Sequence, residues 1–572
     1  MKIVLNKDIQ IEFDERLKFK RAVEFLSEEL KHENPDLKKY RNYSRVPFNI
    51  PEYVYSFDSD ITNLTINIPR GCGDVLRQLL KEINYKLSIK DIEDWTTKGH
   101  RIYFKHKFEP RDEMQVQAIN SYINEKKKNL ILNCSCGFGK SFCALKIVEK
   151  LSISTLILVD ENLLLDQWID NIKNDCVFDL TKLGIVGKGK EDYKDKDIIV
   201  ASKDTLINRP EIIEYINQHI GFVIVDEAHV ASADIFQGVL KNLSPTRVLG
   251  LTATPKRSDG LSYLMHEQLG PICYRANRAD LLANNSIMNP SLRVIYVNNG
   301  KYFENQFESH KNNKRAELQS IAPDENGKYK IGNRKFTQKT LEKKIKAIDY
   351  IDMDWTFLSN AVENDMKTIK EISKIIKYHY DNGDQSICIC RKIEFAKKYL
   401  NTLKSLGIPE DEISLILGET KSSERTELIE KAKNQKLKVI ITSSILDKGI
   451  SIDSANVLFL LYPSKNENST EQRIGRVSRT YQGKERAFVY DFIYNHGMFF
   501  SQFYKSQNVE YRECRWNVEK ECTNYDVNKI TNFTNKMISK FYFGEDILLD
   551  EIDINNLQRT LGTGKMLTIQ EG

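Results

Sequence analysis

The sequence lacks the features that mark membrane and secreted proteins. Its longest apolar run, Val457–Leu461, is far shorter than the roughly 18 residues that a membrane-spanning helix requires. The N-terminal residues contain no apolar core of the kind found in signal peptides. The ten cysteines are scattered and form no pair of CxxC units, so neither a disulfide framework nor a zinc site is indicated. We therefore expect a cytoplasmic protein in a reducing compartment, without a membrane partner.

The sequence also lacks a strong charge of one sign. Lysine and arginine number 85 and aspartate and glutamate number 80, which leaves a net charge of +5. This balance permits binding to nucleic acid through a local basic surface but does not demonstrate it. No internal repeat is present at the periods of roughly 20–50 residues that mark repeat proteins. At 572 residues the chain is too long for one ordinary core, so we expect two or more domains.

The pattern of apolar residues divides the chain into five parts. Residues 1–105 mix helical and strand-like periodicities and predict a small α+β module. Residues 106–290 and 365–495 each contain short apolar runs that alternate with helical stretches, which is typical of parallel βαβ units. Residues 291–364 are assigned to a linker with a basic insertion, and 496–572 to a helical, aromatic extension. The predicted fold class is α/β, with two parallel-sheet domains in tandem.

Two segments outside the α/β pattern carry side chains suited to nucleic acid. The insertion at 300–346 is polar and basic, and a solvated surface and a contact with phosphates explain it equally well. In the C-terminal extension aromatic side chains could stack on bases, although packing in a core is the more common role of such residues. The basic residues of the insertion are Lys311, Lys314, Arg315, Lys328, Lys330, Arg334 and Lys335. The aromatic residues of the extension are Phe499, Phe500, Phe503, Tyr504, Tyr511 and Trp516.

The segment Cys136–Ser141 has the pattern of a phosphate-binding loop. It follows an apolar strand and opens a helical stretch, so its backbone N–H groups can surround phosphate oxygens at a helix N-terminus. Lys140 is expected to reach the β- and γ-phosphates, and the Ser141 hydroxyl is expected to help hold Mg²⁺. Cys134 stands where such loops usually begin with glycine. The residues expected to surround the phosphates with their backbone are Gly137, Phe138 and Gly139.

Two acidic residues follow the apolar run Val223–Val225 directly. The end of a buried parallel strand places them at the carboxyl edge of the sheet, beside the phosphate-binding loop. Phosphoryl transfer needs charge neutralisation and an in-line nucleophile. We therefore expect Asp226 to bind Mg²⁺ and Glu227 to orient and deprotonate the attacking water.

The segment Asp226-Glu227-Ala228-His229 resembles the DEAH form of motif II in superfamily 2 helicases, and further motifs follow in the order found in that family. The resemblance implies two RecA-like domains that use ATP and Mg²⁺. Gln115 resembles the family's adenine-reading glutamine, and Arg111 in the same segment is assigned to the nucleotide as well. Gln117 is a nearby alternative for the adenine contact.

Three further segments of the first domain resemble family motifs. Leu156–Trp168 resembles motif Ia, and Val200–Leu206 resembles the next element at a strand end. The resemblance implies contacts with the nucleic-acid backbone, for which we name Gln167, Ser202 and Thr205. Leu251–Pro255 resembles motif III, which implies that Thr252 and Thr254 couple hydrolysis to domain movement.

The second domain contains segments that resemble motifs V and VI. Glu471–Arg479 resembles motif VI, which implies that Arg476 and Arg479 stabilise charge at the γ-phosphate and that Gln472 faces ATP. Ile441–Ser451 resembles motif V, which implies a nucleic-acid contact for Thr442 and a nucleotide contact for Gly449. Ser451 stands where many relatives carry aspartate, and the residues open to substitute for it are Asp447 and Asp453.

Over residues 108–495 the chain looks most like phage branch-migration helicases of the UvsW type and their XPB- and RecG-like relatives. This resemblance implies an ATP-dependent DNA helicase or translocase that remodels forked or branched DNA in replication, recombination or repair, with proteins of those processes as partners. A viral source would place it in the host-cell cytoplasm. An RNA helicase or remodeller and the motor of a restriction or defence assembly are the alternatives. The sequence predicts neither oligomeric state nor direction of movement.

Overall fold

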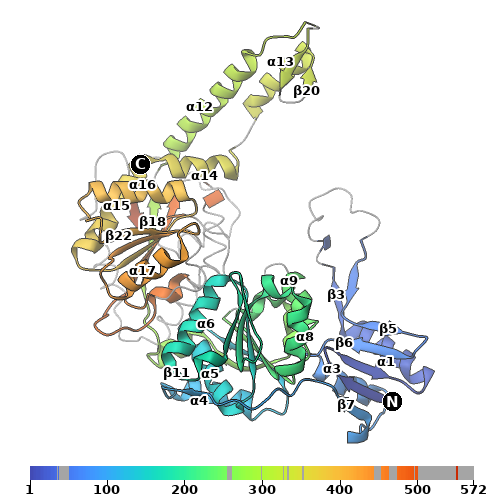
Figure 1. Ribbon diagram of the computed structural model, residues 1–572. Coiled ribbons are helices and arrows are strands. Elements are labelled where there is room, and N and C mark those ends of the chain that lie inside the picture. The colour runs from blue at the N-terminus through green and yellow to red at the C-terminus, as the bar shows by residue number, and fades with distance from the viewer. Residues whose placement is uncertain are drawn as a thin grey trace. The chain divides into compact units, whose positions relative to one another are not determined.

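The computed structural model describes residues 1–499 apart from 35, 38–49, 233, 254–260, 298, 326, 332–333, 351–352, 443–451, 463–472, 495 and 497, together with 549–551 (Figure 1). The chain divides into two compact units. The first comprises Met1–Ser286, and the second comprises the chain from Ile287 onward apart from Lys448–Ile450. In these described ranges, no helix is both long enough and apolar enough to cross a bilayer.

The first unit begins with a small α+β module. Its five-stranded sheet has the order β5-β6-β2-β1-β7, and its core is made by alternating residues such as Ile9 and Ile11, which are buried beneath the helices. The predicted α+β module is therefore present. Its elements are β1 (Lys2–Leu5), β2 (Ile9–Glu12), α1 (Arg16–Glu29), β3 (Lys31–Glu33), β4 (Tyr53–Tyr55), β5 (Asp58–Asp60), β6 (Thr65–Ile68), α3 (Gly73–Glu82) and β7 (Ile92–Asp94).

The rest of the first unit is built on an eight-stranded sheet with the order β13-β12-β14-β10-β15-β16-β9-β17. Every pairing is parallel except that of β12 with β13. Helices cover both faces, so the inner strands read as continuous apolar runs. The strands are β9 (Asn129–Cys134), β10 (Thr155–Val159), β12 (Leu183–Gly187), β13 (Lys190–Asp192), β14 (Ile198–Ser202), β15 (Phe222–Val225), β16 (Arg247–Thr252) and β17 (Ile272–Ala276). The helices are α4 (Glu113–Ile123), α5 (Lys140–Leu151), α6 (Asn162–Asp175), α7 (Lys203–Leu206), α8 (Pro210–His219), α9 (Asp234–Leu240), α10 (Ser262–Leu269) and α11 (Arg278–Ala283).

The module is fixed to this sheet domain by a polar joint between the residues after β6 and two partners, the segment before β16 and helix α10. Arg70 is buried and donates hydrogen bonds to the carbonyl oxygens of Leu243 and Pro245 at 3.2 and 2.9 Å. The backbone N–H of Gly71 donates to the Glu267 carbonyl oxygen at 2.7 Å. A Cβ at position 71 would lie 2.4 Å from that oxygen, so only glycine fits. The first unit therefore holds the module and the sheet domain in direct contact.

The second unit is built on a seven-stranded sheet with the order β22-β23-β21-β24-β25-β18-β26. All pairings are parallel except that of β18 with β26. The two parallel sheets confirm the predicted fold class. The strands are β18 (Ser291–Val297), β21 (Ser386–Ile389), β22 (Ile413–Ile416), β23 (Val439–Thr442), β24 (Val457–Leu460), β25 (Phe488–Tyr494) and β26 (Leu549–Glu551). The helices that pack on them are α14 (Trp355–Asn364), α15 (Met366–Asp381), α16 (Ile393–Ser405) and α17 (Ser422–Lys433).

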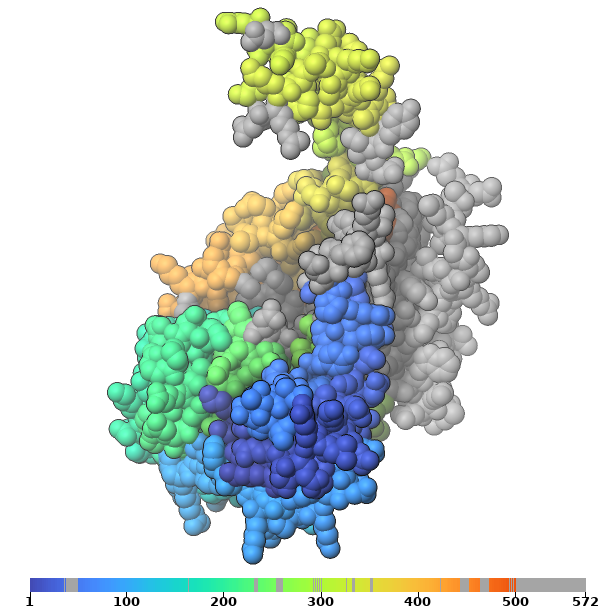
Figure 2. Space-filling view, turned by 90° about the vertical axis from the view of Figure 1, so that its right-hand side faces the viewer, coloured from blue at the N-terminus to red at the C-terminus, as the bar shows by residue number. Residues whose placement is uncertain are grey.

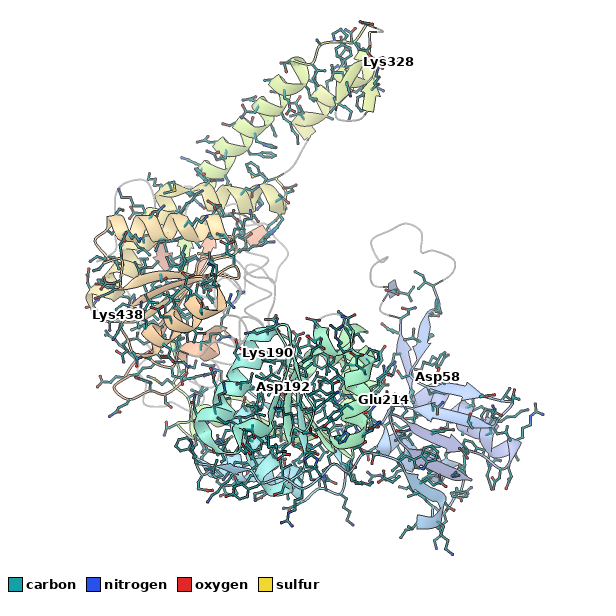
Figure 3. All side chains as sticks on the ribbon, in the orientation of Figure 1. Asp58, Lys190, Asp192, Glu214, Lys328 and Lys438 are labelled. Atoms are coloured by element: carbon teal, nitrogen blue, oxygen red, sulfur yellow. The ribbon has the colours of Figure 1, made fainter. Side chains whose placement is uncertain are left out.

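The interval 291–364 differs from the predicted linker. Its first residues form β18, which pairs along its whole length with β25. Between β18 and α14 the chain forms an arm that stands out from the body of the second unit (Figures 1 and 2). The elements of the arm are α12 (Gly300–Gln319), β19 (Tyr329–Ile331), β20 (Arg334–Phe336) and α13 (Gln338–Ala347). The predicted basic insertion is therefore a folded projection with exposed lysines, and Lys328 lies at its outer end (Figure 3).

Little of the predicted C-terminal extension falls within the described residues. Phe499 is buried and its ring lies 5.3 Å from that of Trp355 and 6.0 Å from that of Phe303. This aromatic residue therefore packs in the core of the second unit. Phe500, Phe503, Tyr504, Tyr511 and Trp516 lie outside the described residues.

Candidate nucleotide site

The phosphate-binding loop connects β9 to α5. Gly137 and Gly139 have φ angles of +87° and +91°, a region of backbone conformation that favours glycine. A Cβ at position 139 would also lie 2.6 Å from Nε2 of Gln115. Helix α5 begins at Lys140, so the loop presents the N-terminus of a twelve-residue helix to a ligand. The Lys140 ammonium donates a hydrogen bond to the Cys134 carbonyl oxygen at 2.9 Å.

Gln115 and Arg111 brace this loop. Nε2 of Gln115 donates to the Phe138 carbonyl oxygen at 2.8 Å, and its Oε1 accepts from the backbone N–H of Arg111 at 2.9 Å. The Arg111 guanidinium donates to the carbonyl oxygens of Gly137 and Phe138 at 3.2 and 3.3 Å. Both predicted residues are thus in contact with the loop, whereas the alternative Gln117 is exposed.

The acidic pair follows β15, which is separated from β9 by the single strand β16. Asp226 is buried, and its two oxygens accept hydrogen bonds from the Trp168 indole at 2.8 Å and from the Glu227 backbone N–H at 2.9 Å. Burial and the neighbouring Glu227 carboxylate raise the pKa of Asp226 to about 6. Glu227 has a φ of +48°, a strained conformation of the kind found at functional sites.

Lys140 shares this environment. Burial alone would lower its pKa, but the surrounding acidic groups, including Cys136, Glu227 and Asp226, outweigh burial and raise the pKa. The ammonium therefore stays charged in this partly buried position, which is the charge state that the predicted contact with phosphate requires. The two predicted halves of the site, the loop and the acidic pair, meet at one edge of the sheet.

The residues present fit a magnesium ion. Magnesium prefers oxygen ligands such as the Ser141 hydroxyl and the Asp226 carboxylate, and it usually retains several waters. Burial, together with the charge of the neighbouring Glu227, raises the pKa of Asp226, and a nearby divalent cation relieves the cost of holding two such carboxylates ionised.

His229 connects the acidic pair to the next motif. Its Nδ1 lies 3.3 Å from Oε2 of Glu227 and 3.3 Å from Oγ1 of Thr252. Thr252 is fully buried at the end of β16. The sequence predicted roles for Glu227, Thr252 and Asp226, but it did not predict His229 as the neighbour of the first two or Trp168 as the neighbour of Asp226. Their positions inside the family-like segments were the only signal for them.

The predicted nucleic-acid contacts have varied surroundings. Ser202 and Thr442 are buried, and the Thr442 hydroxyl donates to the Ile416 carbonyl oxygen at 2.8 Å inside the sheet of the second unit. These two side chains are therefore not displayed on a surface in this structure. Gln167 and Thr205 are partly exposed. The predicted site residues Thr254, Gly449 and Gln472 lie outside the described residues.

The two predicted arginines lie in the second unit, at and just after a short helix over 473–477. Arg476 is buried. Arg479 forms an ion pair with Asp453, with 3.0 Å between Nη1 and Oδ1. Asp453 is one of the two residues considered as substitutes for the aspartate that Ser451 replaces, and the other, Asp447, lies outside the described residues.

Comparisons with known protein families match both units. Residues 107–257 match the family model described as the res subunit of type III restriction enzymes. Residues 367–481 match the helicase conserved C-terminal domain. The first match contains the phosphate-binding loop and the acidic pair, and the second contains Arg476 and Arg479.

Several individual proteins are also similar to the chain. Putative helicase 22 of Sulfolobus islandicus filamentous virus is 28% identical over 70% of this chain and 67% of its own. The DNA 3'-5' translocase XPB2 of Sulfurisphaera tokodaii is 26% identical over 66% of this chain and 80% of its own. Among solved structures, T4 UvsW aligns with 90% of this chain and 98% of its own at 15% identity, with a TM-score of 0.34.

The two matched family models follow each other along the chain, each on its own parallel-sheet domain. The nucleotide loop, the acidic pair and the two arginines lie within them. The chain is therefore a superfamily 2 helicase, an enzyme with ATP-dependent helicase activity, and the XPB2 translocase is among the proteins that it resembles in sequence.

Proposed function

We propose that this enzyme is a DNA translocase that uses ATP to remodel forked or branched DNA. The observation that carries the proposal is the placement of Lys140, Asp226 and Glu227 at the carboxyl edge of one parallel sheet. The similarity to XPB2, which is named a DNA 3'-5' translocase, favours DNA over RNA as the polymer.

In the proposed reaction each side chain has a separate task. Lys140 neutralises charge on the β- and γ-phosphates, and Glu227 orients the attacking water and accepts its proton. Ser141 and Asp226 hold Mg²⁺, which neutralises charge on the phosphate oxygens when bound. Arg476 and Arg479 stabilise the charge that develops on the γ-phosphate in the transition state. Removal of any one of these charges slows hydrolysis.

Coupling to movement is proposed to pass through His229. Its ring touches the water-orienting Glu227 and the motif III residue Thr252. A change at the γ-phosphate alters the charge around Glu227, and a histidine between two hydrogen-bonding groups responds to such a change. The chemical step and the strand β16 are thus joined by one side chain.

The arm is proposed to contact the phosphates of the nucleic acid. Residues 301–350 contain twelve lysine and arginine residues and seven acidic residues. This surplus of five positive charges equals the net charge of the whole chain. Lys314, Lys328, Lys330, Lys339 and Lys343 are all exposed. A projecting, locally basic element attracts the sugar-phosphate backbone without reading its sequence.

The proposal is tested by the ATPase rate of the wild type and of Lys140→Ala. Each is measured without nucleic acid and with single-stranded DNA, forked DNA or structured RNA. We expect forked DNA to stimulate the wild type most strongly and the variant to lose hydrolysis under all conditions. Stimulation by structured RNA alone would replace the proposal with an RNA remodeller. A motor that follows duplex DNA without acting on forks would instead fit a restriction or defence assembly.

A further inference from the structure

We propose that Asp453 is a positioning residue for ATP hydrolysis, which together with Lys484 forms a seat that fixes the direction of the Arg479 guanidinium. This inference rests on the proposed role of Arg479 at the γ-phosphate. It assigns a function to the Asp453 carboxylate. Asp453 lies two residues after Ser451, and it is position 451 at which related sequences are expected to carry an aspartate.

The backbone of Arg479 is held from two sides. The preceding residue, Ser478, is buried, and its hydroxyl donates to the Ile474 carbonyl oxygen at 2.9 Å. Its carbonyl oxygen accepts from the backbone N–H of Met288 at 2.6 Å. Arg479 itself forms an antiparallel bridge with Ile287. The backbone that follows the short helix over 473–477 is therefore held in place, and this fixes the position of the Arg479 Cα from which the side chain extends.

The turn that carries Asp453 is anchored to the sheet of the same unit. The neighbouring Ile452 and Ser454 are both buried. The Ser454 hydroxyl donates to Oε1 of Gln385 at 2.6 Å, and Nε2 of Gln385 donates to the carbonyl oxygens of Ala432 and Leu437 at 2.8 and 2.7 Å. The position of Asp453 is thus set by the buried Ile452 on one side and by the buried hydrogen bonds of Ser454 on the other.

Lys484 ties the two partners together through their backbones. Its ammonium donates to the carbonyl oxygen of Asp453 at 3.1 Å and to that of Arg479 at 3.0 Å. Burial lowers the pKa of Lys484 to about 8. A buried ammonium is costly unless its hydrogen bonds are made. The ammonium of the partly buried Lys484 thus bridges the two backbone segments, and its two hydrogen bonds fix the distance between them.

The ion pair between Asp453 and Arg479 then sets the direction of the guanidinium. The two side chains are 45% and 32% exposed, and a pair that exposed ordinarily contributes little to stability. We therefore assign to the ion pair the orientation of the Arg479 guanidinium and not the stabilisation of the fold. A guanidinium is a rigid planar fork of donors, so contact at one nitrogen restricts the whole group. A group restrained before the reaction loses less freedom when it meets a developing charge.

The test is a double-mutant cycle on ATP hydrolysis with saturating forked DNA. The variants are Arg479→Ala, Asp453→Ala, the double variant, and Asp453→Glu. For each, kcat, KM for ATP and the Kd of a fluorescent ATP analogue are measured. We expect Arg479→Ala to lower kcat at least 100-fold. Asp453→Ala should lower kcat about tenfold with KM and Kd unchanged, and Asp453→Glu should recover part of that loss. In the Arg479→Ala background, Asp453→Ala should have no further effect.

A matched control is the exposed pair of Arg209 with Glu191, with 2.6 Å between Nε and Oε1. Glu191→Ala removes an arginine–carboxylate contact of similar exposure elsewhere in the chain and should leave kcat unchanged. Thermal unfolding midpoints of Asp453→Ala and Glu191→Ala show whether either change disturbs the fold.

The outcomes separate the inference from the proposed function. If Asp453→Ala keeps the wild-type kcat, the seat is overturned and Arg479 retains its role. The same holds if Asp453→Ala lowers kcat by the same factor in the wild type and in the Arg479→Ala background. Wild-type kcat in Arg479→Ala overturns the role of Arg479 and the seat together. An increase in KM with unchanged kcat overturns the seat, because it assigns Asp453 to nucleotide binding.

Discussion

The indole nitrogen of Trp168 donates a hydrogen bond to Oδ2 of Asp226 at 2.8 Å. Trp168 lies on α6, 58 residues before the aspartate, and both side chains are buried. This contact joins the segment that resembles motif Ia to the acidic pair. Hydrogen bonds around a ligating carboxylate fix its orientation, so we expect the tryptophan to orient Asp226 in its proposed role as a magnesium ligand.

Trp168→Phe should impair the use of magnesium. The substitution retains an aromatic ring and removes the donor to a charged group. We expect kcat for ATP hydrolysis to fall about tenfold, equivalent to ~1.4 kcal/mol in the barrier. The Mg²⁺ concentration for half-maximal rate should rise about 10-fold or more. A magnesium titration of the ATPase rate measures both quantities.

Ile172→Ala is the matched control for this prediction. Ile172 is buried on the same helix, and its truncation should cost about 2–5 kcal/mol of stability without changing the magnesium dependence. An unchanged magnesium dependence in Trp168→Phe would remove the indole from any role in the site.

Thr252→Val should separate hydrolysis from strand separation. Valine keeps the shape of threonine and removes the hydroxyl that contacts His229 at 3.3 Å. We expect the hydrolysis rate to stay within about threefold of the wild type, ~0.7 kcal/mol in the barrier. Unwinding of a forked duplex should fall about tenfold in the same preparation.

The control for Thr252 is Thr155→Val in the same sheet. The Thr155 hydroxyl is buried and donates to the Ile153 carbonyl oxygen at 2.7 Å, far from the acidic pair in sequence. This variant should leave both rates in their wild-type ratio. Equal losses of hydrolysis and unwinding in Thr252→Val would place the hydroxyl in the chemical step instead.

Gly71→Ala should loosen the joint between the N-terminal module and α10. The added methyl group would lie 2.4 Å from the Glu267 carbonyl oxygen, so backbone must move. We expect a loss of about 1–3 kcal/mol in the free energy of unfolding, measured by denaturant titration. Gly73→Ala is the control two residues away, where a Cβ meets nothing within 4 Å. It should be neutral or stabilise by about 0.5–1 kcal/mol, and equal effects of the two changes would refute the joint.

Neutralising the outer end of the arm should weaken DNA binding and its salt dependence. In Lys328→Ala/Lys330→Ala, we expect the slope of log K against log salt concentration to fall by up to about 2, close to one for each phosphate that is no longer neutralised. Binding measured at several salt concentrations gives the slope. Lys433→Ala/Lys436→Ala, on and just after α17, removes two exposed charges from the body of the same unit. An identical slope in both double variants would exclude the arm as a phosphate-binding element.

Asp384→Asn should destabilise the second unit at neutral pH more than in acid. Burial alone would raise the pKa of Asp384, but hydrogen bonds from His379 and Asn456 outweigh burial and lower it. A pKa below the unfolded value of about 3.9 means that the ionised group stabilises the fold above that pH. The contribution is lost as the pH falls through the folded pKa.

The expected loss in Asp384→Asn is about 1–3 kcal/mol near pH 7, and it should shrink below about pH 4. Unfolding monitored at several pH values measures this difference. Asp381→Asn, which removes an exposed partner of Lys377, should show little change at any pH. A loss in Asp384→Asn that is independent of pH would contradict the ionic role.

Local patterns in the sequence were enough to predict the core of both domains and the nucleotide site. The strands β10 and β15 are continuous apolar runs because both faces of a parallel sheet are covered. The loop before Lys140 is one continuous segment, and Asp226 and Glu227 are adjacent in the sequence. The chemistry of each group could therefore be predicted without knowledge of tertiary contacts.

Features set by long-range packing could not be predicted in this way. Strand β18 was assigned to a linker because its partner β25 lies nearly two hundred residues later in the chain. The hydrogen bond of Trp168 depends on which helix covers which strand. The ion pair of Asp453 with Arg479 depends on how two loops meet. No periodicity or motif encodes such meetings, because each side chain is compatible with many partners until the sheet is assembled.

The two ends of the arm lie together at the body of the second unit, where the ring of Phe307 on α12 is 5.0 Å from that of Phe357 on α14. Arg315 on α12 pairs with Asp349, just before α14, so the outgoing and returning chains are within side-chain reach. Phe303 and Phe307 at the base of α12 are buried in the body. Everything between positions 316 and 348 can therefore be exchanged for a short turn, or for a different recognition element, without cutting a strand of the sheet. The substrate preference of such a motor can evolve by replacement of the arm while the two parallel-sheet domains stay unchanged.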